Sequence, residues 1–240
     1  MFKASLLAAA LLLGASFAHA ATIVVNGDFE TVHGDGGSDI YGMTDYNSTG
    51  DTLSALADGT RSSSWDVFHA IPGWTKGDGT TGIEVQTTNA LGIKPHSGDH
   101  YIELDSEGNR TQPSNSSMQQ TVILDAGRYA LSFWYRGRPG TTDGSNGITS
   151  AIGNGILDIL EVNSGLDGLA KNDWTRITRR FTVDNDNTET TLVFAAVGRN
   201  DELGGFVDTV SISAIPLPAG AWLILSGLAG LGVMRRFKRG

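Results

Sequence analysis

The chain has 240 residues, with 17 Lys and Arg against 26 Asp and Glu, and it contains no cysteine. The absence of cysteine excludes disulfides, thiolate chemistry and cysteine-ligated zinc or iron–sulfur sites. The formal net charge of −9 repels the phosphates of nucleic acid, so we expect no nucleic-acid partner.

Residues 1–20 have the three parts of a secretory signal peptide, in the expected order. Lys3 supplies the positive charge, a leucine-rich apolar run follows at 6–13, and the Ala-His-Ala at 18–20 is a small-x-small cleavage site. The apolar run is too short to span a membrane. We therefore expect export through the Sec translocon and a mature chain that begins at Ala21; an uncleaved N-terminal anchor is the alternative.

Residues 21–214 are long enough for one sizeable core, so we predict one domain. Of the 17 basic residues, 12 fall outside the first 20 and last 26 positions, together with all 26 acidic residues, which gives a formal charge of −14. Such a surface suits an exported domain that stays soluble or binds cations.

Alternation of apolar and polar residues predicts antiparallel strands throughout this domain, and no segment has a helical apolar stripe. The strongest strand covers 129–136, and the others are predicted at 23–25, 83–86, 101–104, 119–124, 156–162, 176–183, 192–196 and 206–212. We expect a turn at 125–127, a hairpin loop at 184–187 and long loops near 31–64 and 137–155. This pattern indicates an all-β sandwich or jelly roll.

Several aromatic and charged residues are candidates for a carbohydrate-binding face, because sugars bind where an aromatic ring lies beside polar side chains. The candidates are Trp74, Glu84, Tyr101, Glu103, Trp134 and Arg136. Packing of each tryptophan in the core, with the charges on a solvated sheet face, is the alternative. The chain has no G-x-S-x-G and no H-E-x-x-H motif, so we expect no enzyme, although Glu84 and Glu103 could pair in a glycan hydrolase.

A structural cation is a further prediction. Asp208 is predicted to share a strand face with the apolar Phe206, Val210 and Ile212, and an acid on an apolar face is costly unless it is paired. The N-terminal run at 26–30 carries further acids, and the two segments together could supply the oxygens that Ca²⁺ prefers. Pairing of Asp208 with an arginine such as Arg179, or capping of a turn, is the alternative.

The last 26 residues differ from the domain. Residues 215–219 read Ile-Pro-Leu-Pro-Ala, an uncharged stretch follows to 234, and Arg235, Arg236, Lys238 and Arg239 end the chain. A helix over 219–234 would be about 24 Å long, short for a hydrocarbon core of about 30 Å. The basic cluster would stay in the cytoplasm.

This tail resembles the VPLPA-type C-terminal sorting signal, a relative of the PEP-CTERM signals, with its motif at Pro216, Leu217, Pro218 and Ala219. The resemblance implies that an exosortase removes the tail. The protein would be anchored in the inner membrane before processing and would then reach the cell surface or extracellular matrix. A permanent single-pass anchor is the alternative.

The domain itself resembles the galactose-binding-like jelly rolls, in particular bacterial relatives of the plant domain-of-unknown-function-642 family. The matching segments include residues 26–30, 72–74, 82–85, 98–105, 120–122, 127–133 and 205–210. The resemblance implies an antiparallel jelly roll with a carbohydrate-binding or matrix-associated role, and a structural Ca²⁺ joining the first and last strands at Asp28, Glu30 and Asp208. Our leading hypothesis is that the domain binds extracellular polysaccharide without catalysis. Thr209 stands where the family has a second acid. A purely structural envelope or biofilm protein and a glycan-active hydrolase are the other functions considered.

Overall fold

The computed structural model describes residues 23–31, 65–68, 70–78, 80–106, 114–141, 144–153, 155–160 and 173–216. The predicted signal peptide, most of the loop at 31–64 and the tail beyond Pro216 lie outside these residues. Within the described ranges, no helix has the length and apolar character needed to cross a membrane. The helix predicted at 219–234 is therefore still a prediction.

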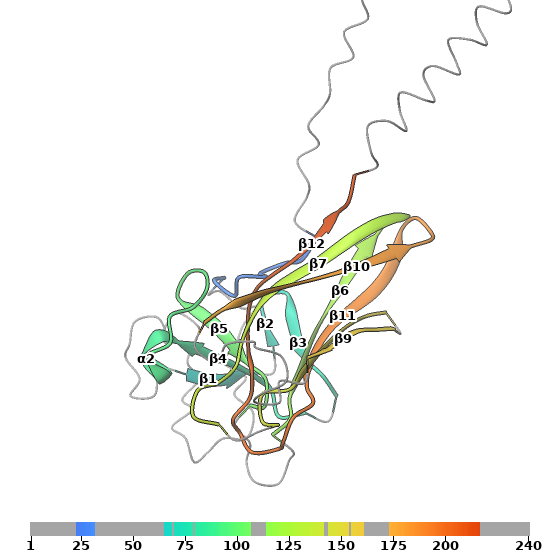
Figure 1. Cartoon of the computed structure of the whole chain (residues 1–240). Helices are drawn as coiled ribbons and strands as arrows, with labels where there is room; N and C mark the ends of the chain where they lie inside the picture. Colours follow the sequence, from blue (N-terminus) through green and yellow to red (C-terminus); the bar gives the residue numbers. More distant parts are fainter. Residues whose placement is uncertain are drawn as a thin grey trace, which may run out of the picture.

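Two six-stranded antiparallel sheets form the domain (Figure 1). Sheet A has the order β1 (Trp65–Phe68), β4 (Ile83–Thr87), β5 (His100–Glu103), β12 (Phe206–Ala214), β7 (Gly127–Arg136) and β10 (Thr175–Val183). Sheet B has the order β2 (Ala70–Ile71), β3 (Trp74–Lys76), β6 (Ser117–Leu124), β11 (Thr188–Ala196), β8 (Ile148–Ile152) and β9 (Gly155–Leu160). The described residues also include one helical turn, α2 (Thr88–Leu91). The predicted all-β jelly-roll sandwich is confirmed.

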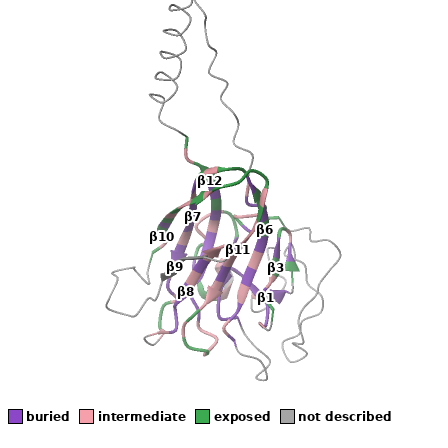
Figure 2. Cartoon of the chain, turned by 90° about the vertical axis from the view of Figure 1, so that its right-hand side faces the viewer, coloured by how far each residue is buried: buried purple, intermediate pink, exposed green. Residues whose placement is uncertain are grey.

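The hydrophobic core lies between the two sheets. As the alternation predicts, β7 points Leu131 and Phe133 inward, where they are fully buried. Phe133 meets Phe194 of sheet B edge-on at 4.9 Å, and Trp74 contacts the same Phe194 ring at 6.1 Å. Buried residues follow the strands, and exposed residues gather in loops and at strand ends (Figure 2). Aromatic side chains thus hold the sheets together, since each buries a large apolar area.

Three predictions about strands are wrong in detail. The segment 137–155 contains β8, so it is not one long loop. The short strands β1, β2 and β3 were not predicted, because two to four residues carry too little alternation to detect. The segment 23–25 is not a strand, because the Gln120 side chain takes the place of a neighbouring strand: Val25 N–H donates to Gln120 Oε1 at 2.7 Å, and Gln120 Nε2 donates to Val25 O at 2.9 Å.

The loops at 125–127 and 184–187 both cross between the sheets. The first joins β6 of sheet B to β7 of sheet A, and the second joins β10 of sheet A to β11 of sheet B. The predicted turn at 125–127 is confirmed, whereas the predicted hairpin at 184–187 is wrong, because β10 and β11 do not pair with each other. Local turn chemistry shows that the chain reverses but not which sheet it enters.

A β-bulge in β12 changes which residues share a face. The register of β12 against β7 shifts between Asp208 and Ser211, and Thr209 has a φ of 51°. One extra residue reverses the alternation beyond it. Phe206 and Asp208 therefore lie on one face, whereas Val210 and Ile212 join the core on the other. The prediction that all four residues share a face is wrong for this reason.

Candidate functional site

The candidate site is the outer face of sheet A, opposite its core face. Directly paired residues of neighbouring strands point to the same side of a sheet. The register pairs Glu84 with Glu103, pairs Phe206 with both Glu103 and Arg136, and pairs Asp208 with Trp134. The outer face therefore combines, from three strands, five of the six predicted ligand-binding residues: Glu84, Tyr101, Glu103, Trp134 and Arg136.

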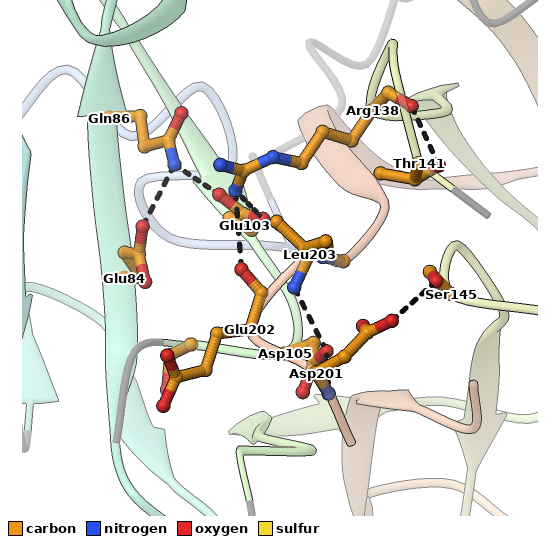
Figure 3. Close-up of polar contacts among 12 residues, drawn as sticks. Glu84, Gln86, Glu103, Asp105, Arg138, Thr141, Ser145, Asp201, Glu202 and Leu203 are labelled. Atoms are coloured by element: carbon orange, nitrogen blue, oxygen red, sulfur yellow. Dashed lines mark hydrogen bonds and ion pairs between the residues drawn. The ribbon is translucent and has the colours of Figure 1, made fainter. Parts of the chain in front are cut away.

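A polar network covers the β4–β5 half of this face (Figure 3). Gln86 Nε2 donates to Glu84 Oε1 at 2.8 Å and also donates to Glu103 Oε2. Tyr101 donates its hydroxyl to Gln86 Oε1 at 2.9 Å. Arg138 Nη1 donates to Glu103 Oε1, which also accepts the backbone N–H of Gly204 at 2.9 Å. Both carboxylate oxygens of Glu103 are thus held by donors from three parts of the chain.

The electrostatics of this network follow from its burial. Burial and then the nearby Glu84 charge raise the pKa of Glu103 well above its usual value, whereas Arg138 and the Gly204 N–H oppose the rise. Burial and then Glu103 raise the pKa of the Tyr101 phenol, so this hydroxyl stays protonated as a donor. Arg138 is the cation that pairs with Glu103, and removing it would leave this buried carboxylate without its cation.

The loop that contributes Gly204 is itself fixed by a second buried acid. Asp105 Oδ2 accepts the backbone N–H groups of Asp201 at 3.2 Å and Leu203 at 3.1 Å. Asp201 is held in turn by the Ser145 hydroxyl at 2.7 Å. Burial raises the pKa of Asp105 to about 6. These contacts keep the loop against the polar network, as Figure 3 shows.

Aromatic side chains cover the middle of the outer face. Trp134 is half-buried and stacks on His96, with ring centroids 3.8 Å apart and 17° between planes. His96 Nδ1 lies 2.7 Å from Thr209 Oγ1, and burial lowers the pKa of the imidazole, so its ring is neutral at physiological pH. The stack covers one face of the Trp134 ring and fixes its orientation.

A second aromatic contact lies beside it. Trp174 meets Tyr101 edge-on at 5.8 Å and donates its indole N–H to Lys94 O at 2.8 Å. Tyr101 and Phe206 pack edge-on at 5.0 Å, and Ile93 completes this small apolar cluster. The residues 93–96 that follow α2 are thereby attached to the sheet.

The structure separates the predicted ligand-binding residues into three groups. Trp74 is 1% exposed in the core, where its indole donates to Asn26 O at 3.1 Å, so it cannot contact an external ligand. Glu84, Tyr101 and Glu103 are on the outer face but are 4%, 0% and 0% exposed, so they support the face from within. Trp134 and Arg136 are partly accessible.

Three residues of the site are not among the six predicted ligand-binding residues: Gln86, His96 and Arg138. Gln86 lies on the same strand face as Glu84, so alternation was a usable signal for it. His96 and Arg138 arrive from loops, and no local pattern predicts contacts across 38 or 35 positions to Trp134 and Glu103.

Two of the three predicted cation ligands, Glu30 and Asp208, contact a single loop. Val210 N–H donates to Gly27 O at 2.7 Å, which puts the N-terminal segment beside β12 (Figure 1). Glu30 Oε1 accepts the N–H groups of Asp99 and His100 at 2.9 and 2.8 Å. Asp208 Oδ2 accepts those of His96 and Ser97 at 2.8 and 3.0 Å. Both acids therefore hold the loop 96–100.

These hydrogen bonds already engage most of the carboxylate oxygens that a cation would need. Glu30 Oε2 lies 3.2 Å from His100 Nδ1, and Asp208 Oδ1 accepts the Thr209 N–H. Asp28 is exposed. Burial raises the pKa of Asp208 to about 7. Over the described ranges, no group of three or more His, Asp or Glu side chains is placed to hold a metal ion. Arg179 does not pair with Asp208; its Nη1 donates to Thr178 O at 3.1 Å.

Comparisons with known proteins support the fold. No family model matches the chain, and no curated protein does. The apo form of a cyclase from Fischerella sp. aligns with a TM-score of 0.50 at 18% identity, over 83% of this chain and 98% of that chain. TmCBM61 in complex with β-1,4-galactotriose aligns with a TM-score of 0.39 at 19% identity, over 59% of this chain and 88% of that chain. The CBM22-1 xylan-binding domain from Paenibacillus barcinonensis Xyn10C aligns with a TM-score of 0.37 at 10% identity, over 61% of this chain and 88% of that chain. At 18% identity, the similarity to the cyclase concerns the fold alone.

Proposed function

We propose that this chain is an exported cell-surface or extracellular-matrix protein whose jelly-roll domain binds polysaccharide without catalysis. The observation that supports the proposal most is the Trp134 ring, partly accessible on β7 of a polar sheet face and stacked on His96 with ring centroids 3.8 Å apart. An aromatic ring can pack against the apolar face of a sugar while polar neighbours bond its hydroxyls. Arg136, two residues along β7, is such a neighbour.

The buried network beneath this face supports the same function. Glu84, Gln86 and Glu103 hold one another across two strands, and Arg138 ties them to the loop before β12. A face that is already rigid loses less conformational entropy when it binds a ligand. The network therefore serves to pre-organise the surface on which Trp134 lies.

The same geometry supports binding without hydrolysis. The two acids of a glycosidase flank the scissile bond, about 5–9.5 Å apart. Here Glu84 and Glu103 both accept hydrogen bonds from one nitrogen, Gln86 Nε2, so an amide occupies the space where a substrate would lie. Both acids are also buried. We propose that they are structural.

A structural envelope protein without a small ligand is the second candidate. The burial of Glu84, Tyr101 and Glu103 favours it, because these residues are already satisfied within the protein. Both candidates share the export signal at 1–20 and the sorting motif at 216–219, and thus the Sec translocon and an exosortase as partners.

The experiment that separates the two candidates is a binding survey. The full-length chain, purified in mild detergent, would be applied to a glycan array and to insoluble polysaccharides, with and without calcium. Retention on particular glycans supports the binding function. A folded protein that is retained by no polysaccharide in either condition would exclude it and leave the structural role.

Replacement of Trp134 by alanine should reduce retention on the selected polysaccharide about tenfold or more, because stacking on an aromatic ring is lost. Affinity electrophoresis of both proteins measures the change. Trp134→Phe should keep most of the binding. Ile123→Ala, at a residue 62% exposed on sheet B, is the matched control and should bind like the parent. Equal binding by Trp134→Ala would rule out this face.

The calcium prediction is independent of the binding function. We propose Glu30 and Asp208 as ligands, with backbone oxygens of the loop 96–100. Calcium should then raise the melting temperature over that in a chelator at pH 8, where Asp208 is ionised, and Asp208→Asn should abolish the difference. A melting temperature that is identical in calcium and chelator would eliminate the site, without affecting the polysaccharide proposal.

A further inference from the structure

The β7–β10 half of the outer face is basic, although the chain as a whole is acidic. Its outward residues include Arg128 and Arg136 on β7 and Arg176 and Arg180 on β10. The register puts Arg176 opposite Trp134 and Arg180 opposite Ala130, so all four arginines lie on the same side of the sheet as Trp134. We call this set the arginine face.

The arginines are available for a ligand. Arg128, Arg176 and Arg180 are exposed. None of the four makes an ion pair with a described residue; the described ion pairs are Arg138 with Glu103 and His100 with Glu30. Arg136 Nε is buried without any hydrogen-bond partner, which leaves a donor of a permanently charged group unsatisfied.

Little negative charge lies among the outward residues of this half of the sheet. Among the outward residues of β12, β7 and β10, the one acid described is Asp208, which is 0% exposed and directed at the loop 96–97. The exposed acids of the loops at 125 and 184–186 lie beyond the Arg128 end. Arg136 and Arg176, by contrast, flank Trp134, far from those loops.

The spacing of the groups fits a repeating ligand. Arg176 and Arg180 are four residues apart on one strand, roughly 13 Å at about 3.3 Å per residue. Between them lie hydroxyl groups, with Ser132 accepting a bond from Arg176 Nε at 3.1 Å and Thr178 exposed. Guanidinium groups bind carboxylates through two parallel hydrogen bonds. Trp134 offers a surface for the ring of the sugar itself.

We propose that the arginine face makes the site selective for acidic polysaccharides, with Arg176 and Arg136 binding the carboxylate of a uronate residue that packs on Trp134, and Arg180 binding a carboxylate further along the chain. This inference rests on the proposed polysaccharide binding and specifies its ligand class. Charge complementarity is its basis, since an acidic domain attracts a polyanion only where its cations are concentrated.

The test uses the full-length chain in mild detergent and two probes with the same backbone, polygalacturonate and its highly methyl-esterified form. Polygalacturonate should bind at least about tenfold more tightly than the ester, and binding should weaken as salt rises. Arg176→Gln should weaken binding of polygalacturonate about tenfold, and R176Q/R180Q should weaken it further. Arg176→Lys should keep only part of the binding, because lysine keeps the positive charge but lacks the planar guanidinium that forms two parallel hydrogen bonds with a carboxylate. Arg199→Gln, with an equal change of charge at an exposed loop, should have no effect.

The outcomes are distinguishable. Equal binding of the ester, or of R176Q/R180Q and the parent, would overturn the acidic-ligand inference. If neutral xylan or galactan is then retained with no effect of these substitutions, polysaccharide binding itself stands. If no polysaccharide is retained, both proposals fail. Double-stranded DNA that binds as tightly as polygalacturonate, and is lost in R176Q/R180Q, would show a general polyanion surface and would also overturn the inference.

Discussion

Replacement of Arg138 by methionine is expected to lower the free energy of unfolding by about 3–5 kcal/mol at pH 8, because it leaves a buried carboxylate without its cation. Glu103 is 0% exposed, and Arg138 forms its ion pair. Methionine keeps much of the apolar stem of arginine, so the loss of stability measures mainly the effect of removing the positive charge. Urea unfolding followed by circular dichroism measures the difference.

The effect should depend on pH in a defined direction. The folded-state pKa of Glu103 is raised, first by burial and then by Glu84, and removal of Arg138 raises it further. A raised pKa means that the protonated form favours folding, so the deficit of the variant should grow as pH rises above the ordinary glutamate range. Glu103→Gln combined with Arg138→Met should recover most of the loss. A deficit that is the same at pH 5 and pH 8, with no recovery in the double variant, would contradict the ion-pair account.

Replacement of Trp74 by alanine should destabilise the domain by about 3–5 kcal/mol, as expected for a large buried aromatic residue. Trp74 contacts Phe29 at 5.9 Å and Phe194 at 6.1 Å, and its indole holds Asn26 O. The variant should therefore loosen the N-terminal segment as well as the core. Thermal unfolding of the full-length chain measures the loss.

The matched comparison is Trp134→Ala, which removes the same side chain from a half-buried position and should cost much less stability. Trp74 should thus matter for folding and Trp134 for binding. Equal destabilisation by the two substitutions would show that Trp134 is also a core residue, and the assignment of the outer face would have to be abandoned.

Much of the fold was predictable because β7 alternates cleanly. Leu131 and Phe133 mark the core face, and Trp134 and Arg136 mark the outer face, from the sequence alone. The bulge at Thr209 was not predictable, since a positive φ at a threonine leaves no trace in hydrophobic periodicity. Because of this bulge, Val210 and Ile212 face the core. Asp208 therefore does not share a face with them, contrary to the prediction.

The site was predicted in part for the same reason. Glu84 and Glu103 were placed on the correct faces of their strands, but their burial depends on loops that pack over them, and periodicity cannot show this. The sequence did not distinguish Trp74 from Trp134 as a ligand-binding residue. Trp74 follows a turn and Trp134 lies in a strand, and neither pattern shows whether the ring is buried. Which tryptophan is buried depends on Phe194 of β11, two strands away in the same sheet, a contact across 120 positions.

The most direct test of the central claim is hydrogen–deuterium exchange of the full-length chain, with and without the soluble polysaccharide selected by the array. The ligand should slow exchange in peptides from β7, β10 and the segment 93–97 that carries His96, all of which border the Trp134 surface. Peptides from β3, β6 and β11 in sheet B should be unchanged. Protection confined to sheet B, or none anywhere under saturating ligand, would contradict the assignment of polysaccharide binding to the outer face of sheet A.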